Sequence, residues 1–235
     1  MNLITVGSGS TGNCYLLESN GQILILDAGM PVKDVKKALG WNIMSIQGAI
    51  VTHIHKDHSK SISDLGLMGI RTLVPHEHDS DSADATFGNF IVQMFALKNK
   101  DGQWVHTHAD GSACPIYGAL IRTEDRNILY CTDYRSMPYT FQSFHLDTII
   151  TSCNYEDDAE YDNDAKEYHV RLGHTSLSTV KEMLKVNQTD ALKNVVLCHL
   201  SAAADVSRIQ REVKEVVGNN VTVNLAITGT TIELR

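Results

Sequence analysis

A cluster of four potential metal ligands directly after an apolar run constrains this chain more than any other feature. Residues 49–52 are strand-like, and the chain then reads His-Ile-His-Lys-Asp-His. Side chains alternate along a strand, so His53 and His55 are expected on one side, where they could bind one ion. Asp57 and His58 follow where the chain must turn and could face a second ion, about 3.5–4 Å from the first. Imidazole and carboxylate ligands suit zinc, manganese or iron.

The composition is that of a globular protein, with 43% hydrophobic and 20% charged residues. The net charge of −8 argues against a protein held on nucleic acid or anionic lipid by bulk electrostatics. Five widely spaced cysteines without a C-x-x-C pair make a disulfide framework or a cysteine-based zinc finger an unlikely interpretation. No apolar run approaches the roughly 18–20 residues of a membrane span, and the N-terminus lacks the features of a signal peptide. We therefore expect a cytoplasmic protein with no membrane partner.

Short strand-like runs outnumber helical ones, which predicts an α/β or α+β layered fold. The expected helices are 32–39, 179–186 and 206–217, and the expected strands are 3–6, 15–18, 23–26, 49–52, 119–122, 128–131, 148–151 and 195–198. Residues 221–226 and 231–234 are expected to pair as a closing hairpin across Gly229.

The remaining polar and histidine-bearing segments have no expected role in metal binding. The acidic stretch 77–88 is expected to be an exposed loop rather than a domain boundary. His76 and His78 are expected to be solvated in that region, and His145 and His169 to be structural or surface residues.

Several segments resemble the metallo-β-lactamase superfamily. The run H-I-H-K-D-H is similar to its H-x-H-x-D-H signature, and a strand ending in Asp27-Ala28-Gly29 resembles the segment that precedes it. The strands ending at Asp133 and at His199 resemble those that carry the metal-bridging aspartate and the last histidine ligand. The order and rough spacing agree over nearly the whole chain. The resemblance implies a single domain over 1–235 with a four-layer αββα sandwich that binds two divalent ions, zinc or manganese.

The resemblance also implies a ligand set. His53 and His55 would hold the first ion with a third histidine that follows the strand near residues 95–97. An extra stretch, 98–105, intervenes here, and both His106 and His108 are candidates; the residues after His108 resemble those after the family ligand, which favours His108. The second ion would be held by Asp57, His58 and His199. Asp133 would bridge both ions.

Residues around the ligands have expected supporting roles. Asp27 is expected to fix a ligand or a loop from behind. The glycine-rich loop 7–13 could contact a phosphate through its backbone, Ser10 and Asn13, or could simply connect two strands. His174, in Gly-His-Thr-Ser before an expected helix, is a candidate proton donor to a leaving group; the alternative is that it helps to cap that helix.

Four segments are similar, more narrowly, to the YycJ-like group, which contains DNA nucleases and has relatives in phages and prophages. They are residues 7–15, Asn154-Tyr155, 173–176 and 199–201. This resemblance implies a dinuclear-metal phosphodiester hydrolase, specifically a DNA exonuclease in which two ions activate a shared water, with Asp57 and His174 in the chemistry and Asn154 near the substrate. The net charge weighs against a long nucleic acid, although five lysines could form a local basic rim: Lys33, Lys36, Lys37, Lys56 and Lys60.

Three alternatives remain open at this stage. A phosphodiesterase for small or cyclic nucleotides would suit an acidic protein better. The same ions could act on a lactone or thioester carbonyl. A non-catalytic metal-binding regulator would keep the ligands without turnover.

Overall fold

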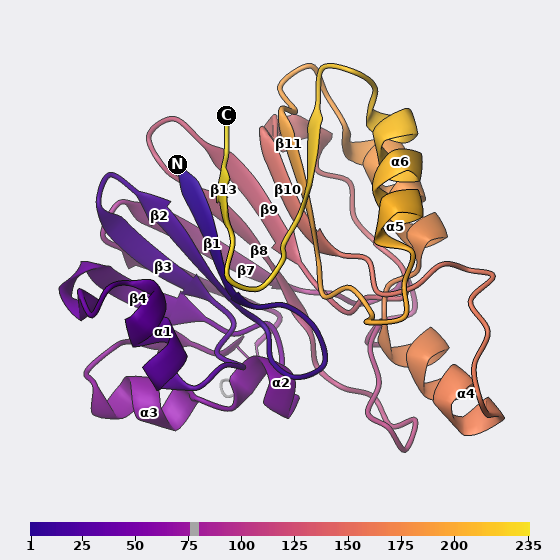
Figure 1. The fold of residues 1–235 in the computed structure, drawn as a ribbon, viewed down its shortest axis with the longest axis horizontal. Coiled ribbons are helices and arrows are strands. Elements are labelled where there is room, and N and C mark those ends of the chain that lie inside the picture. Colours follow the sequence, from indigo (N-terminus) through magenta and orange to yellow (C-terminus); the bar gives the residue numbers. More distant parts are fainter. Residues whose placement is uncertain (76–79) are drawn as a thin grey trace.

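The structure, a computed structural model, describes residues 1–75 and 80–235, with only the backbone described at 165, 166 and 169. His76, His78 and the side chain of His169 therefore lie outside the described residues. Figure 1 shows two β-sheets packed face to face, with helices on the outer face of each. The predicted α/β class and αββα layering are confirmed.

The described strands of the first sheet run in the order β13-β1-β2-β3-β4-β5. Strands β3 and β4 pair in parallel, with Leu26 opposite Ile50, so their carboxyl ends meet at one edge. The strands are β1 (Asn2–Gly7), β2 (Cys14–Ser19), β3 (Gln22–Leu26), β4 (Ile46–Ile50), β5 (Thr72–Leu73) and β13 (Thr231–Glu233).

The second sheet has the order β12-β11-β10-β9-β8-β7-β6 over the described residues. Strands β9 to β12 are parallel neighbours, whereas β6 to β9 pair antiparallel. The strands are β6 (Ser82–Phe87), β7 (Phe90–Ala96), β8 (Tyr117–Arg122), β9 (Asn127–Cys131), β10 (Thr148–Ser152), β11 (Asn194–Cys198) and β12 (Thr222–Leu225).

Helices cover the outer faces of both sheets and complete three apolar layers. Leu24 and Tyr130 belong to the central layer between the sheets. Helices α5 (Leu177–Asn187) and α6 (Val206–Val217) pack on the second sheet. Helices α1 (Val32–Ala38) and α3 (Ile62–Leu67) pack on the first. Strands β3, β10 and β11 are almost fully buried because they are covered on both faces, which explains their continuous apolar sequences.

The remaining helical segments lie near the sheet ends or on loops. Helix α2 (Lys56–Ser59) follows the histidine cluster, and α4 (Asp164–Gly173) extends away from the sheets in Figure 1. Short 3₁₀ turns are η1 (Ile43–Ser45) and η3 (Gln142–Phe144). Among the described residues, we find no helix with the length and apolar character needed to cross a membrane.

Two expectations about this architecture were wrong. Residues 82–87 of the acidic stretch form β6, an edge strand whose side chains alternate between exposed and partly buried and which pairs with β7. The C-terminal segments do not form a hairpin: β12 pairs with β11, whereas β13 crosses to the other sheet and pairs with β1. The turn at Gly229 therefore carries the chain from one sheet to the other. The turn-forming sequence around Gly229 predicted a bend but not the partners of the two strands.

Candidate metal centre

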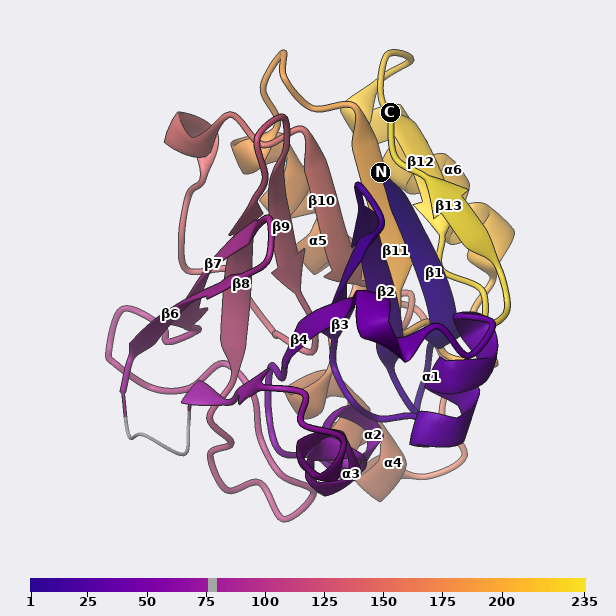
Figure 2. The same cartoon turned by 90° about the vertical axis from the view of Figure 1, so that its left-hand side faces the viewer.

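The candidate ligands gather where parallel strands of both sheets end. Asp27 follows β3, the histidine cluster follows β4, Asp133 follows β9 and His199 follows β11. Figure 1 shows α2 at the lower ends of both sheets, and Figure 2 shows the same edge from the side. Carboxyl ends of parallel strands are the usual position of a site in α/β folds, because the connecting loops converge there.

One group consists of His53, His55 and His106, with one donor atom from each within 4.8 Å of the others. Nε2 of His106 lies 3.0 Å from Nδ1 of His55. His53 is fully buried, and its Nε2 has no hydrogen-bond partner among the described residues. His53 and His55 are brought together by the loop between β4 and α2 and not, as the alternation argument assumed, by the strand itself.

A second group consists of Asp57, His58 and His199. Asp57 Oδ2 lies 3.3 Å from Nε2 of His58 and 3.2 Å from Nε2 of His199. The two imidazole rings are stacked, with centroids 5.2 Å apart and planes 7° apart. Asp57 and His58 are adjacent on α2, so a single helical turn presents both ligands.

Asp133 lies between the two groups. Its Oδ2 is 2.9 Å from Nε2 of His58, 3.5 Å from Nε2 of His199 and 3.9 Å from Nε2 of His53. The carboxylate is 1% exposed, so it is surrounded by imidazole nitrogens rather than by water. This is the position that a bridging ligand would need.

The electrostatics of the two groups fit a pair of cations. Burial lowers the pKa of His53 well below its ordinary value and that of His106 to about 3, so both rings stay neutral and keep a free lone pair. Burial opposes ionisation of Asp133, but His199 and His174 hold its pKa well below the usual range. The donors are nitrogen and oxygen atoms, and the buried Nε2 of His53, which has no hydrogen-bond partner among the described residues, is available to bind a cation. The residues therefore fit two divalent metal ions.

The sequence favoured His108 over His106 as the third histidine of the first ion. The structure places His106 in the group with His53 and His55, and it places His108 on the opposite side of His55, in a separate group with Cys114. The reason is the shape of the extra stretch 98–105. Its last residue, Val105, donates its backbone N–H to the carbonyl of Leu97 at 3.1 Å, so the stretch closes on itself and returns the chain to the end of β7.

Asp27, which the sequence analysis expected to fix a ligand or a loop, contacts both a candidate ligand and the strand end before the histidine cluster. Its carboxylate accepts hydrogen bonds from the backbone N–H of Thr52 at 2.8 Å and from Oη of Tyr130 at 2.6 Å. Its Oδ2 is also 2.7 Å from Nδ1 of His58. This contact turns the Nε2 of His58 toward Asp133 and Asp57.

The glycine-rich loop is a strand connection that also reaches the ligands. It joins the antiparallel strands β1 and β2. Asn13 Nδ2 lies 3.0 Å from Nε2 of His58, and Oγ of Ser8 accepts a hydrogen bond from the backbone N–H of His199 at 3.0 Å. Ser10 lines a cavity that lies beside His174 and His199. The sequence interpretation missed Ser8, because a serine that accepts a hydrogen bond from a distant backbone N–H has no recognisable sequence motif.

Gly29 allows this loop to approach the metal ligands. The backbone N–H of Gly29 donates to Asn13 O at 2.9 Å, and the backbone N–H of Asn13 donates to Asp57 O at 2.6 Å. A Cβ atom added at Gly29 would collide with the carbonyl oxygen of Asp57. Glycine is therefore required as the third residue of the Asp-Ala-Gly segment because two backbones approach closely there, and not because it takes part in metal binding.

Three of the strand-end residues adopt left-handed backbone conformations. The φ angles are 60° at Asp27, 52° at Asp133 and 51° at His199. Such angles are uncommon outside glycine and are best tolerated by asparagine, aspartate and histidine. Each residue turns the chain sharply as it leaves its strand, which aims its side chain across the sheet edge.

His174 and Asn154 border the site from the second sheet. Nδ1 of His174 lies 2.9 Å from Asp133 Oδ1, and Nδ2 of Asn154 lies 2.6 Å from Nδ1 of His199. Helix α5 is capped by Ser176, whose Oγ accepts the backbone N–H of Thr179 at 3.2 Å. His174 is therefore not the cap residue, and its ring faces the metal centre.

A cavity of about 670 Å³ opens beside His174 and His199. Its walls come from residues 154–156, 158–161 and 199–205, with Val170 of α4 and Arg208 of α6. The sequence interpretation named Asn154-Tyr155 and 199–201 but not residues 158–161 or 202–205. Tyr155 and Tyr161 in this wall pack edge to face, and the guanidinium of Arg171 lies 5.9 Å and 5.8 Å from their ring centroids.

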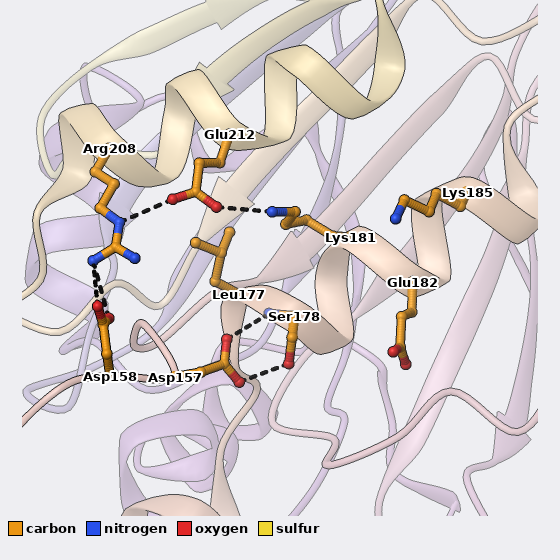
Figure 3. A pocket seen from close by; sticks show the side chains of 9 residues that line it. All are labelled: Asp157, Asp158, Leu177, Ser178, Lys181, Glu182, Lys185, Arg208 and Glu212. Carbon is orange, nitrogen blue, oxygen red and sulfur yellow. Dashed lines mark hydrogen bonds and ion pairs between the residues drawn. The ribbon is translucent and has the colours of Figure 1, made fainter.

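An ion-pair network holds the cavity wall against α5 and α6 (Figure 3). Arg208 contacts both carboxylate oxygens of Asp158 at 2.9 and 3.0 Å and donates from Nε to Glu212 at 2.9 Å. Lys181 contacts the other oxygen of Glu212 at 2.8 Å. The neighbouring Asp157 accepts hydrogen bonds from the backbone N–H and the hydroxyl of Ser178, at 3.0 and 2.6 Å. The wall is thus attached to two helices outside the metal centre.

Comparison with known proteins identifies the architecture. A structure of the metallo-β-lactamase fold protein YhfI from Bacillus subtilis superimposes with a TM-score of 0.66 over 98% of both chains, at 18% identity. The chain has the metallo-β-lactamase fold. A sequence profile of the metallo-β-lactamase superfamily also matches residues 7–67.

Other proteins share this fold or part of the sequence. Human tRNase Z, short form, superimposes with a TM-score of 0.61 over 100% of both chains at 15% identity, and yeast PDE1 with 0.66 over 98% of both at 10%. The anti-Pycsar protein Apyc1 of Bacillus phage 010DV004 is 36% identical over 74 residues, which are 28% of this chain. The match spans less than a third of that relative, 29% of its length.

Proposed function

We propose that this chain is a metal-dependent phosphodiester hydrolase whose substrates are small or cyclic nucleotides. The cavity beside His174 and His199 carries the proposal. Its volume, about 670 Å³, falls within the range of small-ligand sites. Its lining includes His199 of the second ligand group and His174, whose ring contacts Asp133. A compact substrate can therefore place its phosphate at the metal centre and the rest of its atoms in the cavity.

The charge of the cavity wall also favours a small substrate. Glu156, Asp158, Glu160 and Asp205 line the cavity, and Arg208 is the cation among its lining residues. Arg208 is already paired with Asp158, so the wall has little positive charge to offer to further phosphates. A long polyanion would be repelled here, as the net charge of −8 also indicates.

Some residues at the centre would hold the metal ions, and others would face the substrate. His53, His55 and His106 would hold one ion, Asp57, His58 and His199 the other, and Asp133 would contact both. Two bound divalent ions supply charge neutralisation at a phosphoryl oxygen and a more acidic water. Asn154 would fix the ring of His199, and His174, beside Asp133, would donate a proton to the leaving oxygen.

The relatives are compatible with phosphate chemistry. A diphosphatase of the PhnP family has the same fold, with a TM-score of 0.58 at 15% identity. The anti-Pycsar phage protein shares sequence over 74 residues. These likenesses support an active hydrolase on this fold; the choice of substrate depends on the cavity.

The second candidate is the DNA exonuclease that the YycJ-like resemblance implies. The specific observation in its favour is the row of lysines near the first sheet. Lys56 begins α2 directly after His55, Lys60 follows that helix, and Lys33 and Lys36 lie on α1. These charges could contact a DNA backbone that reaches the centre from the side opposite the cavity.

A substrate panel separates these candidates. The protein is assayed with manganese or zinc on cyclic mononucleotides, bis-p-nitrophenyl phosphate, end-labelled DNA and RNA, a lactone and a thioester. We expect turnover of the cyclic nucleotides and of bis-p-nitrophenyl phosphate, with loss of turnover in His58→Ala. Degradation of DNA without cyclic-nucleotide turnover would replace the proposal with the exonuclease. Lactone or thioester turnover alone, or metal uptake with no turnover, would overturn both.

A further inference from the structure

His55 makes close contacts through both ring nitrogens. Nδ1 lies on the inner side, 3.0 Å from Nε2 of His106, and Nε2 lies on the outer side, 2.9 Å from Nδ1 of His108. The ring centroids of His55 and His108 are 4.9 Å apart and their planes are inclined by 70°. His55 therefore stands between the metal centre and a second imidazole that the ligand set does not use.

The chemistry of imidazole fixes the roles of the two nitrogens. If Nδ1 of His55 gives its lone pair to a cation in the inner group, the ring hydrogen must be on Nε2. That N–H points at Nδ1 of His108, which must then be an acceptor and carry its own hydrogen on Nε2. Metal-binding histidines commonly donate their second N–H to a carboxylate or carbonyl in this way, and the partner fixes the ring orientation.

His108 is itself held by a compact turn. Its backbone N–H donates to Ser112 O at 2.8 Å, and its carbonyl accepts the N–H of Gly111 at 2.9 Å. The carboxylate of Asp110 accepts from the backbone N–H and the hydroxyl of Ser112, at 2.9 and 2.6 Å. The backbone N–H of Cys114 then donates to His106 O at 3.1 Å. The turn that carries His108 is thus tied to the segment that carries His106.

The outer group of His55, His108 and Cys114 has the composition of a metal site, so this alternative must be weighed. A cation there would require His55 to lose both ring hydrogens while its other nitrogen binds the inner ion. This requirement disfavours an outer ion when the inner group is loaded.

We propose that His108 is a positioning residue: its Nδ1 accepts the Nε2–H of His55 and holds that ring with Nδ1 directed into the metal centre. The proposal rests on the metal centre and not on the identity of the substrate. It also gives the second histidine of the His106–His108 pair a role distinct from that of the first.

Metal affinity of purified variants tests the proposal without any substrate. Zinc dissociation constants are measured by chelator competition for wild type, His108→Ala, His108→Asn and His106→Ala. The expected loss is about 10–100-fold for one of the two ions in His108→Ala. His108→Asn should regain most of it, because the amide oxygen can accept the same N–H. His106→Ala, which removes a ligand, should lose that ion more completely.

Two further variants and a stability control complete the test. His145→Ala, at an exposed histidine remote in sequence, and Cys114→Ala should both keep the wild-type zinc constants. The thermal midpoints of metal-free His108→Ala and His108→Asn should agree, so that a difference in zinc affinity reports ring orientation rather than folding. Wild-type affinity in His108→Ala, failure of His108→Asn to recover it, or loss of an ion in Cys114→Ala would each overturn the proposal. Wild-type protein that binds no zinc would overturn the metal centre itself, whereas normal zinc binding without phosphodiester turnover would overturn only the proposed function.

Discussion

Oδ2 of Asp27 lies 2.7 Å from Nδ1 of His58, and both side chains are fully buried. The same oxygen accepts a hydrogen bond from Oη of Tyr130, a residue of the layer between the sheets. Burial alone would lower the pKa of His58, but the carboxylates of Asp27 and Asp133 raise it well above its ordinary value. The packing between the sheets and the orientation of a candidate metal ligand therefore depend on one carboxylate.

Asp27→Asn should weaken zinc binding by about 10–100-fold while the fold is kept. One carboxylate oxygen of Asp27 accepts from Thr52, and the other faces the donors of His58 and Tyr130. An asparagine amide would therefore turn its NH2 group against a donor in either orientation, although asparagine tolerates the left-handed backbone at this position. Chelator competition measures the zinc affinity, and circular dichroism monitors the fold. Tyr130→Phe is the matched control, because it removes a single hydrogen bond to the same oxygen and leaves the carboxylate. Equal zinc constants in wild type and Asp27→Asn would rule out the supporting role.

Asp57→Ala and His58→Ala should each abolish turnover and reduce the zinc content from two ions to one. Both side chains belong to the second ligand group, and neither contributes to the apolar layers. Metal analysis after gel filtration, with circular dichroism, checks the result. His145→Ala serves as the histidine control. Two retained ions with full activity in either variant would show that the second ion is bound elsewhere.

His174→Ala should reduce kcat by about 10²–10⁴-fold on a substrate with an alkoxide leaving group. The loss on a p-nitrophenolate ester should be much smaller, because that leaving group departs without a proton. The two substrates are compared at saturating concentration in the same metal buffer. Equal losses on both would remove the role of His174 as proton donor and leave it as a contact of Asp133.

Gly29→Ala should release the metal and destabilise the protein by at least about 1–3 kcal/mol, because its Cβ would push the backbone of Asp57 away from the loop 7–13. Urea unfolding and zinc content are measured together. Gly66→Ala is the control: Gly66 is exposed in α3 with open space among the described residues, and alanine there should stabilise by about 0.5–1 kcal/mol. Similar behaviour of the two variants would contradict the close approach.

The five cysteines should resist iodoacetamide at pH 8 in the native protein and all react after unfolding. All five are buried, and burial raises the pKa of Cys114 and Cys131 to about 12. Above pH 9.0, the ordinary pKa of a cysteine, the thiols of the unfolded chain lose their protons while the buried thiols of the folded protein keep theirs. The free energy of unfolding should therefore fall as the pH rises above 9.0. Mass spectrometry counts the adducts, and urea unfolding between pH 8 and 10 should show decreasing stability. Rapid alkylation of native protein would contradict this burial.

Much of the candidate site could be predicted from sequence because its ligands follow apolar strands directly. Asp133 and His199 each come within two residues of a buried strand, and the histidine cluster follows β4 in the same way. The third histidine could not be settled, because His106 and His108 differ by two positions and the choice depends on how the stretch 98–105 folds. A backbone hydrogen bond between Val105 and Leu97, separated by eight residues, brings His106 rather than His108 beside His53 and His55.

The errors in the fold have a common physical origin. Strand β6 has few of the apolar residues that mark a strand because it is an edge strand with one exposed face. The C-terminal turn at Gly229 has a hairpin sequence, but long-range pairing separates its two strands between the sheets. Residues 158–161 of the cavity wall were missed because their position depends on contacts with α6, such as Asp158 with Arg208.

The left-handed conformations of Asp27, Asp133 and His199 have a consequence for how this chain can change over generations. The backbone at these positions tolerates asparagine or glycine but penalises valine or isoleucine. An aspartate-to-asparagine exchange at residue 133 would remove the charge of the candidate bridging ligand while leaving the turn and both sheets intact. If the proposed hydrolase activity holds, one conservative exchange would abolish it in a protein that still folds. A lineage would then pass from enzyme to binding protein without an unstable intermediate.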